Sequence, residues 1–224
     1  MFIKDLLMDK KPLNRSVLVT GGTRRIGKVI SDVLRNAGWR VFTSSHDPDS
    51  GADFIQDLTD PSGAVKLYSS VLSADPEGFC AIVNNAALFT GKDSDLESVN
   101  LIAPRKLMML LGGREGINCS VVNILDSKTL GPALETDSVY VKTKRELSAD
   151  TRKFAAMFSD TMRVNAVAPG PVLAPVGLHE SAGEILLKHR PSPQDVALAV
   201  LYLLEAESVT GAVIPVDSGQ HLVF

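Results

Sequence analysis

An α/β fold, built on a doubly wound parallel sheet, is the architecture that the sequence predicts. Short apolar, β-branched runs alternate with helical patterns from one end of the chain to the other. Continuous apolar runs are typical of parallel strands, because such strands are buried on both faces. Right-handed crossovers then place the helices on both faces of the sheet. No linker, repeat or low-complexity segment divides the chain, so we expect a polar lead-in at residues 1–15 and one domain at 16–224.

In the first half of the chain the elements follow from apolar runs and turn residues. Ser16–Thr20 (SVLVT) is the first expected strand. Ile26 and Ile30 share one face of a helix that stops at Gly38, a residue that commonly ends helices. Further strands are expected at 40–43, 53–56 and 79–84, and a helix is expected at 62–73.

In the second half we expect a long helix over 94–111, interrupted near Pro104 because proline lacks a backbone N–H. The remaining elements complete a sheet of about seven strands. Strands are expected at 120–125, 162–167 and 212–216, and helices at 137–158 and 195–205.

Composition excludes several classes of function. The 224 residues are 45% hydrophobic and 22% charged, with a net charge of −3, so a nucleic-acid or anionic-lipid footprint is not expected. Cys80 and Cys119 lie in apolar runs, which indicates buried thiols of a reducing compartment. The four histidines lack metal-ligand spacing. The first eleven residues do not resemble a signal peptide, and no run is long enough to span a membrane. We therefore expect a soluble cytoplasmic protein that uses neither a metal nor a thiol.

The glycine-rich turn after the first strand predicts a phosphate cradle. Gly21 and Gly27 frame a turn that leads directly into a helix. Glycines let the backbone approach a pyrophosphate closely, and the helix start offers unpaired N–H groups to it. The alternative is an ordinary turn between a strand and a helix, but its place in the first β-α unit favours a dinucleotide site.

The end of the second strand indicates which nicotinamide cofactor binds. Ser44 and Ser45 stand there, and no carboxylate appears before Asp47. An acidic residue usually meets the bare 2′-hydroxyl of NAD, whereas arginines such as Arg24 and Arg25 suit a 2′-phosphate. We therefore expect NADP(H) rather than NAD(H). Alternatively, one of the arginines is only a solvated charge at the helix start.

Tyr140 and Lys144 lie four residues apart in a helical stretch, so they face the same way. An ammonium beside a phenol lowers the phenol pKa, and the tyrosine then serves as a general acid near neutral pH. The alternative is a non-catalytic pair, in which the lysine snorkels to solvent beside a half-buried tyrosine.

The chain resembles the short-chain dehydrogenase/reductase family over residues 16–220. The matching residues are Thr20-Gly21, Gly27, Asp57-Leu58, Asn84-Asn85-Ala86-Ala87, Asn100, Tyr140, Lys144, Asn165, Pro169-Gly170 and Val216-Asp217-Ser218-Gly219. The resemblance implies a single-domain Rossmann fold with an NADP(H)-dependent oxidoreductase activity.

The resemblance also implies roles for individual residues. Asp57 and Leu58 would contact the adenine end, and Asn84 with the backbone after it would line the nicotinamide ribose. Asn100 would hold a water in a proton relay through Lys144. Pro169 and the loop after it would cover the nicotinamide. The implied cofactor contacts are Gly21, Thr23, Arg24, Arg25, Ile26, Ser44, Ser45, Asp57, Leu58, Asn84, Ala86, Tyr140, Lys144, Pro169, Gly170 and Val172.

The chain departs from the family pattern at four points. Arg25 replaces the middle glycine of the turn, and Phe89 follows the Asn-Asn-Ala-Ala segment. Counting forward from the strand puts Asp126 at the family's catalytic serine, whereas counting back from Tyr140 puts Ser127 there. We favour Asp126, because loops absorb insertions and strands do not. Fourth, only fifteen positions separate residue 85 from residue 100, which is short for the family.

The first three departures resemble pteridine reductases and the dihydromonapterin reductases similar to them. That resemblance implies that Phe89 and the nicotinamide sandwich a flat pterin, that Arg25 reaches both pyrophosphate and pterin, and that Asp126 acts on the substrate with Tyr140. Stacking on an aromatic ring and hydrogen bonds from ring N–H groups to a carboxylate are physically consistent with this. The alternatives are that Phe89 is core, that Asp126 only caps a turn, and that Arg25 contacts phosphate alone.

Our leading hypothesis is therefore an NADPH-dependent reductase of a pterin or dihydropterin C=N bond. The competing enzyme hypothesis is a carbonyl or alcohol oxidoreductase with Ser127 as the partner hydroxyl. A non-catalytic dinucleotide sensor is a third hypothesis, and the proton-relay residues Asn100, Tyr140 and Lys144 argue against it. The family usually assembles through helices equivalent to 94–111 and 137–158, so we expect a homo-oligomer, in particular a tetramer.

Overall fold

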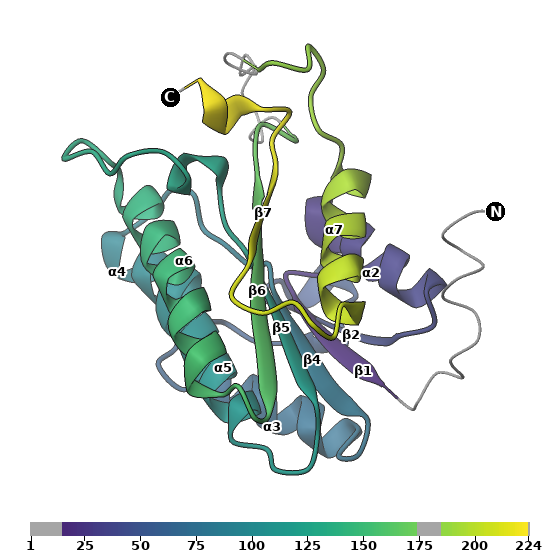
Figure 1. Ribbon diagram of the computed structural model, residues 1–224. Coiled ribbons are helices and arrows are strands. Elements are labelled where there is room, and N and C mark those ends of the chain that lie inside the picture. Colours follow the sequence, from purple (N-terminus) through teal and green to yellow (C-terminus); the bar gives the residue numbers. More distant parts are fainter. Residues whose placement is uncertain (1–14, 174–184, 224) are drawn as a thin grey trace.

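A seven-stranded parallel sheet forms the centre of the protein (Figure 1). The computed structural model describes residues 15–173 and 185–223. The strand order is β3-β2-β1-β4-β5-β6-β7, and every neighbouring pair is parallel. The strands are β1 Ser16–Thr20, β2 Arg40–Ser45, β3 Phe54–Ile55, β4 Phe79–Asn84, β5 Cys119–Ile124, β6 Met162–Pro169 and β7 Val213–Val216. The predicted doubly wound α/β fold is confirmed. The lead-in predicted for 1–15 lies, except for Arg15, outside the described residues.

The strand order reverses between β1 and β4. The chain first moves outward from β1 to β2 and β3, and then crosses back to β4 on the other side of β1. Ligands of doubly wound sheets bind beyond the carboxyl ends of the strands at such a switch point. Thr20 ends β1 and Asn84 ends β4, so the segments that follow these two residues border the expected binding site.

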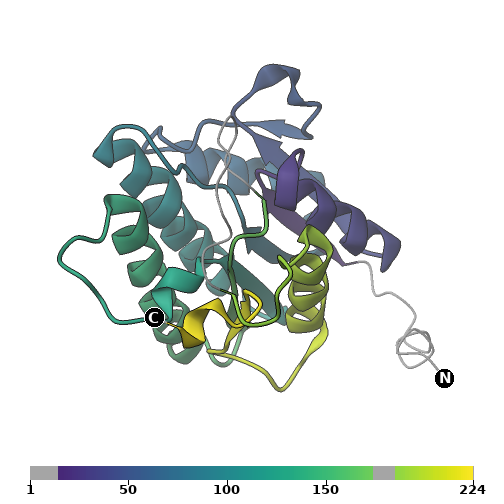
Figure 2. The same cartoon turned by 90° about the horizontal axis from the view of Figure 1, so that it is seen from above.

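Helices cover both faces of the sheet (Figures 1 and 2). Successive side chains of a strand point to opposite faces, and accordingly Val19 packs with Ile30 and Val200 on one side, whereas Leu18 shares the other side's core with Leu107. The first side carries α2 and α7, and the second carries α3, α5 and α6. The helices are α2 Arg25–Asn36, α3 Gly63–Ala74, α4 Asp93–Glu97, α5 Ala103–Gly112, α6 Val139–Met157 and α7 Pro193–Glu205. Within the described ranges no helix has the length and apolar content needed to cross a membrane.

Two helix predictions have different outcomes. The expected interruption near Pro104 occurs as a π-helical turn at Ser98–Ile102, which separates α4 from α5 and in which the N–H of Ala103 donates to the Ser98 carbonyl five residues back. Pro104 itself sits in the first turn of α5, where its missing N–H is tolerated. The last helix begins at Pro193, two residues before the predicted start, because a capping box anchored on Ser192 opens it.

Candidate active site

The glycine turn between β1 and α2 is fastened to the end of β4. The Asn85 side-chain amide donates hydrogen bonds to the carbonyls of Thr20 and Gly21 at 2.9 and 3.1 Å. The Thr20 hydroxyl accepts from the backbone N–H groups of Asn85 and Ala86, both at 3.0 Å. A Cβ on Gly27 would lie 2.1 Å from the Gly21 carbonyl oxygen, so the close approach requires glycine. The turn is therefore held in one shape, and it leads into a helix start, the kind of position at which proteins bind anionic ligands.

Arg25 keeps the backbone shape of the glycine that it replaces. Its φ is +51°, in the left-handed region that favours glycine, and it is the first residue of α2. The N–H of Gly22 donates to the Ser44 carbonyl at 3.3 Å, which brings the end of β2 beside the turn. The side chains of Ser44 and Ser45 are buried, whereas Arg24 and Arg25 are exposed. The two arginines therefore supply the exposed positive charge at this point.

The two residues predicted to contact the adenine end, Asp57 and Leu58, differ in exposure. Asp57 is exposed, and its carboxylate accepts hydrogen bonds from the N–H and hydroxyl of Thr59, both at 2.8 Å. The Leu58 side chain is packed in the core with Leu18 and Phe42. Any contact of Leu58 with a cofactor is thus limited to its backbone.

Tyr140, Lys144 and Asp126 form the polar centre of the site. The Tyr140 hydroxyl donates to Asp126 Oδ2 at 3.1 Å. Lys144 Nζ lies 5.9 Å from the centre of the Tyr140 ring and donates to the Ile124 carbonyl at 2.7 Å. Both helix residues face the end of β5, so they lie on the same side of α6, as their spacing of four residues predicts.

The protonation of this centre differs from our expectation. The sequence predicts that Lys144 lowers the pKa of Tyr140. In the structure burial, together with the neighbouring Asp126 carboxylate, raises the pKa of Tyr140 well above its ordinary value. Burial lowers the pKa of Lys144 to about 8, against a smaller opposing effect of Asp126. The phenol therefore keeps its proton at neutral pH, which is the form that a proton donor needs.

Phe89 lies over this centre and is not a core residue. Its side chain is 57% exposed, so the core interpretation is wrong. The ring meets Tyr140 edge-on, with 4.9 Å between ring centroids and 64° between planes. An exposed aromatic face beside a phenol hydroxyl offers a stacking surface for a flat ligand.

Asp126 and Ser127 have different partners. The Ser127 side chain is buried, and its hydroxyl donates to Gln220 Oε1 at 2.8 Å. Asp126 Oδ1 accepts from the Lys128 N–H at 2.9 Å and caps the short 3₁₀ turn Ser127–Thr129. Asp126 is thus both a turn cap and the partner of Tyr140, and it is the residue that the structure brings to the tyrosine.

Asn100 is fixed in the π-helical turn. Its side chain is fully buried and makes two reciprocal hydrogen bonds of 2.8 Å with the Leu88 backbone. It also donates to the Thr143 hydroxyl at 3.4 Å. The side chain therefore anchors the segment that carries Phe89. Pro104, four residues further on, has no N–H to donate to the backbone carbonyl of Asn100.

The remaining predicted cofactor contacts fall at three places. The Asn84 side chain points into the core and donates to Asn123 Oδ1 at 2.8 Å, so its contribution to a nicotinamide site is limited to backbone. Thr23 and Ile26 are half-buried in the glycine turn. After β6, the N–H of Gly170 donates to the Val216 carbonyl at 3.0 Å.

The chain beyond β6 is described only in part. Pro169 ends β6, and the N–H of Val172 donates to the Gly170 carbonyl at 2.8 Å, which turns the chain over the sheet edge. The predicted cover of the nicotinamide continues into 174–184, which lies outside the described residues.

Comparison with known proteins agrees with this geometry. A family model described as Enoyl-(Acyl carrier protein) reductase matches residues 93–221. The chain belongs to the short-chain dehydrogenase/reductase family. It is 28% identical to Protein FixR of Bradyrhizobium diazoefficiens, over 92% of this chain and 86% of that protein. It is 27% identical to dihydromonapterin reductase of Shigella sonnei, over 92% of this chain and 96% of that protein.

A solved structure is similar along almost the whole chain. FolM alternative dihydrofolate reductase 1 from Brucella canis, complexed with NADP, superposes with a TM-score of 0.81 at 28% identity and covers 94% of this chain and 95% of that one. These relatives place the chain in the pteridine reductase-like branch of the short-chain dehydrogenase/reductase family.

Some contacts of this short-chain dehydrogenase/reductase site were not predicted. The hydrogen bond from Ser127 to Gln220 joins residues 93 positions apart, so no local sequence pattern predicts it. Arg145 follows Lys144 directly and bonds the loop that leads to Tyr140. A single arginine in a helix carries no recognisable motif, and its role depends on how the loop folds back.

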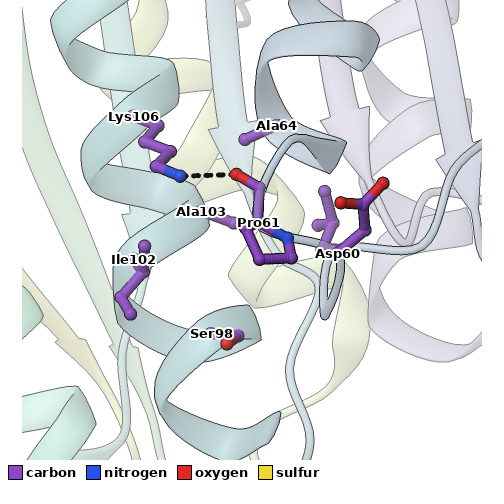
Figure 3. A pocket seen from close by; sticks show the side chains of 8 residues that line it. Asp60, Pro61, Ala64, Ser98, Ile102, Ala103 and Lys106 are labelled. Carbon is purple, nitrogen blue, oxygen red and sulfur yellow. Dashed lines mark hydrogen bonds between the residues drawn. The ribbon is translucent and has the colours of Figure 1, made fainter. Parts of the chain in front are cut away.

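Two cavities lie away from the site. One of about 10 Å³, room for roughly one water, is bordered by Leu58, Ala64 and Ile102, and there Lys106 Nζ donates to the Pro61 carbonyl at 2.5 Å (Figure 3). The other, of about 330 Å³, lies between α6 and the stretch 97–105, which comprises the end of α4, the π turn and the start of α5. Neither contains Tyr140 or Asp126.

Thiol or metal chemistry would require a reactive cysteine or a cluster of metal-ligating side chains. Cys80 and Cys119 are free and buried, and burial raises the pKa of both thiols, that of Cys119 to about 12. Such thiols resist forming the reactive thiolate. Across residues 15–173 and 185–223, no group of three His, Cys, Asp or Glu side chains is arranged to hold a metal ion.

Proposed function

We propose that the protein is an NADPH-dependent reductase that reduces a C=N bond of a pterin or dihydropterin, with Tyr140 as the proton donor. The observation that carries the proposal is the hydrogen bond from the Tyr140 hydroxyl to Asp126, with the exposed ring of Phe89 against the same tyrosine. Two relatives, a dihydromonapterin reductase and an NADP-bound FolM alternative dihydrofolate reductase, support the same substrate class and cofactor.

The residues around the glycine turn fit NADPH. The close approach between Gly27 and Gly21 leaves no room for a side chain, and the Arg24 side chain makes no capping hydrogen bond at the start of α2. The pyrophosphate would lie on the N–H groups of that helix and meet the Arg25 guanidinium, and the exposed guanidinium of Arg24 would meet the 2′-phosphate. Bound NADPH would supply the hydride.

Tyr140 would deliver the proton that accompanies the hydride. The hydride adds to the carbon of the C=N bond, and the phenol proton passes to the nitrogen. Because its pKa is raised, Tyr140 holds that proton at neutral pH until a substrate accepts it. Lys144, buried one helical turn away, would stabilise the resulting phenolate with its ammonium. The Asn100 carbonyl and a water would complete the route by which the proton is replaced.

Phe89 and Asp126 would select the substrate. A flat heterocycle would stack on the Phe89 ring, and the Asp126 carboxylate would accept hydrogen bonds from amino and ring N–H groups. Arg25 would reach the same ring from the glycine turn. A simple ketone offers neither the flat ring nor these donors.

The deciding assay follows NADPH oxidation with dihydropterins, dihydrofolate, a quinonoid dihydropterin and simple ketones. We expect turnover with at least one pterin, and Tyr140→Phe should abolish it while NADPH binding persists. Asp126→Ser, which installs the family's usual hydroxyl, should reduce pterin turnover by about a hundredfold, because it removes the charge that binds the N–H groups. Turnover with ketones but with no pterin would reject the proposal, and turnover by Tyr140→Phe would reject its proton donor.

We also propose that the protein is a cytoplasmic homo-oligomer. Ile102 and Met109 on the α5 side and Leu198 and Tyr202 on α7 are exposed apolar side chains on two helical faces. Two such faces allow a chain to contact more than one copy of itself. Light scattering of the purified protein should give the mass of a tetramer, and the mass of a monomer would contradict this proposal.

A further inference from the structure

The loop between β5 and α6 joins two residues of the candidate site. It begins directly after Asp126 and ends at Ser138, so Tyr140 lies in the first turn of the helix that follows it, and residues 132–136 are exposed. In Figure 1 it is the segment that leaves the upper end of α6 and returns to the sheet. Apart from the short 3₁₀ turn at Ser127–Thr129, this loop has no helix or strand, so it needs other contacts to hold one shape.

Arg145 supplies such contacts from α6. Its Nε donates to Asp137 Oδ2 at 2.8 Å. One terminal nitrogen donates to the carbonyls of Thr129 and Gly131 at 3.2 and 2.8 Å, and the other donates to that of Pro132 at 2.7 Å. The planar guanidinium thus bonds both halves of the loop at once, which an ammonium group cannot reproduce.

The ion pair in this cluster is well sheltered. The side chains of Arg145 and Asp137 are 19% and 12% exposed. Asp137 also accepts the Leu134 N–H at 3.2 Å, and Arg145 is the main cause that lowers its pKa. The carboxylate therefore stays charged at neutral pH and holds the guanidinium in place.

The cluster continues to Asp126. The N–H and the hydroxyl of Thr129 donate to the Asp126 carbonyl at 2.9 and 2.7 Å. The Thr129 carbonyl is the one that Arg145 bonds, so the guanidinium fixes the short turn that Asp126 begins. Asp126 in turn meets the Tyr140 hydroxyl.

We propose that Arg145 is a positioning residue that locks the loop 127–138 in one conformation and thereby sets the Asp126 carboxylate against Tyr140. The inference deepens the proposed function, on which its catalytic part rests. Arg145 touches neither reacting group, and its effect passes through Thr129. The loop is thereby preformed rather than ordered by the substrate.

Three variants test the proposal, with Arg152→Ala, an exposed arginine on the same helix, as the control. In Arg145→Ala, hydrogen exchange of residues 127–138 should rise by about tenfold or more, while exchange in the strands stays unchanged. Arg145→Lys should recover part of the protection. Asp137→Asn should have a smaller effect, because the three carbonyl bonds remain.

Kinetics separates positioning from general stability. With NADPH and a dihydropterin, Arg145→Ala should lower kcat/KM for the pterin by about tenfold, while the KM for NADPH changes by less than about twofold. Unchanged loop exchange, faster exchange throughout the protein, or a looser loop with unaltered kcat/KM would each overturn the inference. If the protein reduces no pterin, the proposed function fails, yet the exchange experiment still tests whether Arg145 holds the loop.

Discussion

Burial of Lys144 should make the stability of the protein depend on pH in a predictable way. The side chain is 2% exposed, and its pKa falls from 10.5 in the unfolded chain to about 8 in the folded one. Between these values the unfolded state binds more protons than the folded state, so stability rises as the pH rises. Below pH 8 the full cost of burying the ammonium applies, and it amounts to about 3 kcal/mol.

Replacing Lys144 with methionine measures the free-energy cost of burying the ammonium. Lys144→Met removes the titrating group but keeps an unbranched apolar chain. It leaves the Ile124 carbonyl without its Nζ–H donor, at a cost of about 1–3 kcal/mol that does not vary with pH. The free energy of unfolding of the wild type minus that of Lys144→Met should therefore increase by about 2.5 kcal/mol from about pH 7 to about pH 10. Contributions of all other groups largely cancel in the difference.

Urea unfolding at several pH values measures the difference. The protein has one tryptophan, the buried Trp39, and its fluorescence reports the transition. Lys142→Met, an exposed lysine on the same helix, is the control, and its difference from the wild type should stay constant over the same range. If the curves of the wild type and Lys144→Met ran parallel, Lys144 would not be buried as an ammonium and the reasoning would be refuted.

Three further changes test the cofactor and substrate regions. Gly27→Ala should destabilise the protein by about 2–4 kcal/mol in thermal or urea unfolding and weaken NADPH binding, because its Cβ would meet the Gly21 carbonyl at 2.1 Å; a stable variant with normal NADPH binding would contradict the rigid turn. Arg25→Gly should leave stability unchanged or raise it by about 1 kcal/mol, since φ is +51° there, while the KM values for NADPH and for a dihydropterin each rise about tenfold. Unchanged KM values would remove Arg25 from the site. Phe89→Ala should change stability by less than about 1 kcal/mol, since the ring is 57% exposed, and raise the KM for a dihydropterin about tenfold; an unchanged KM would remove Phe89 from the substrate site.

Most of the fold could be predicted because its strands are buried on both faces. Residues 17–19 and 81–83 belong to strands that contribute alternately to two cores, so every position is apolar and the strand is recognisable as a continuous run. Helix boundaries are harder to predict from periodicity, since they depend on capping. Ser192 opens α7 through a capping box, and Pro104 fits a helix start because a π turn precedes it.

The candidate site was predictable where its residues lie on regular elements. Tyr140 and Lys144 face one way because of helical spacing, and the glycine turn follows directly from β1. The choice between Asp126 and Ser127 was not fixed by either count, since a loop of variable length separates them from Tyr140. Their directions depend on the turn that Asp126 caps and on Gln220 from the other end of the chain.

By itself the sequence determined the α/β class, the order of the elements and the identity of the glycine turn and the tyrosine–lysine pair, because these depend on periodicity and local spacing. Only the tertiary structure decided which groups meet around Tyr140 and how they are charged. Hydrogen bonds between distant segments bring Asp126 to the phenol and hold the loop on Arg145. Burial then raises the pKa of Tyr140 and lowers that of Lys144. Desolvation and long-range contacts arise from the packed chain as a whole, and no stretch of sequence contains them.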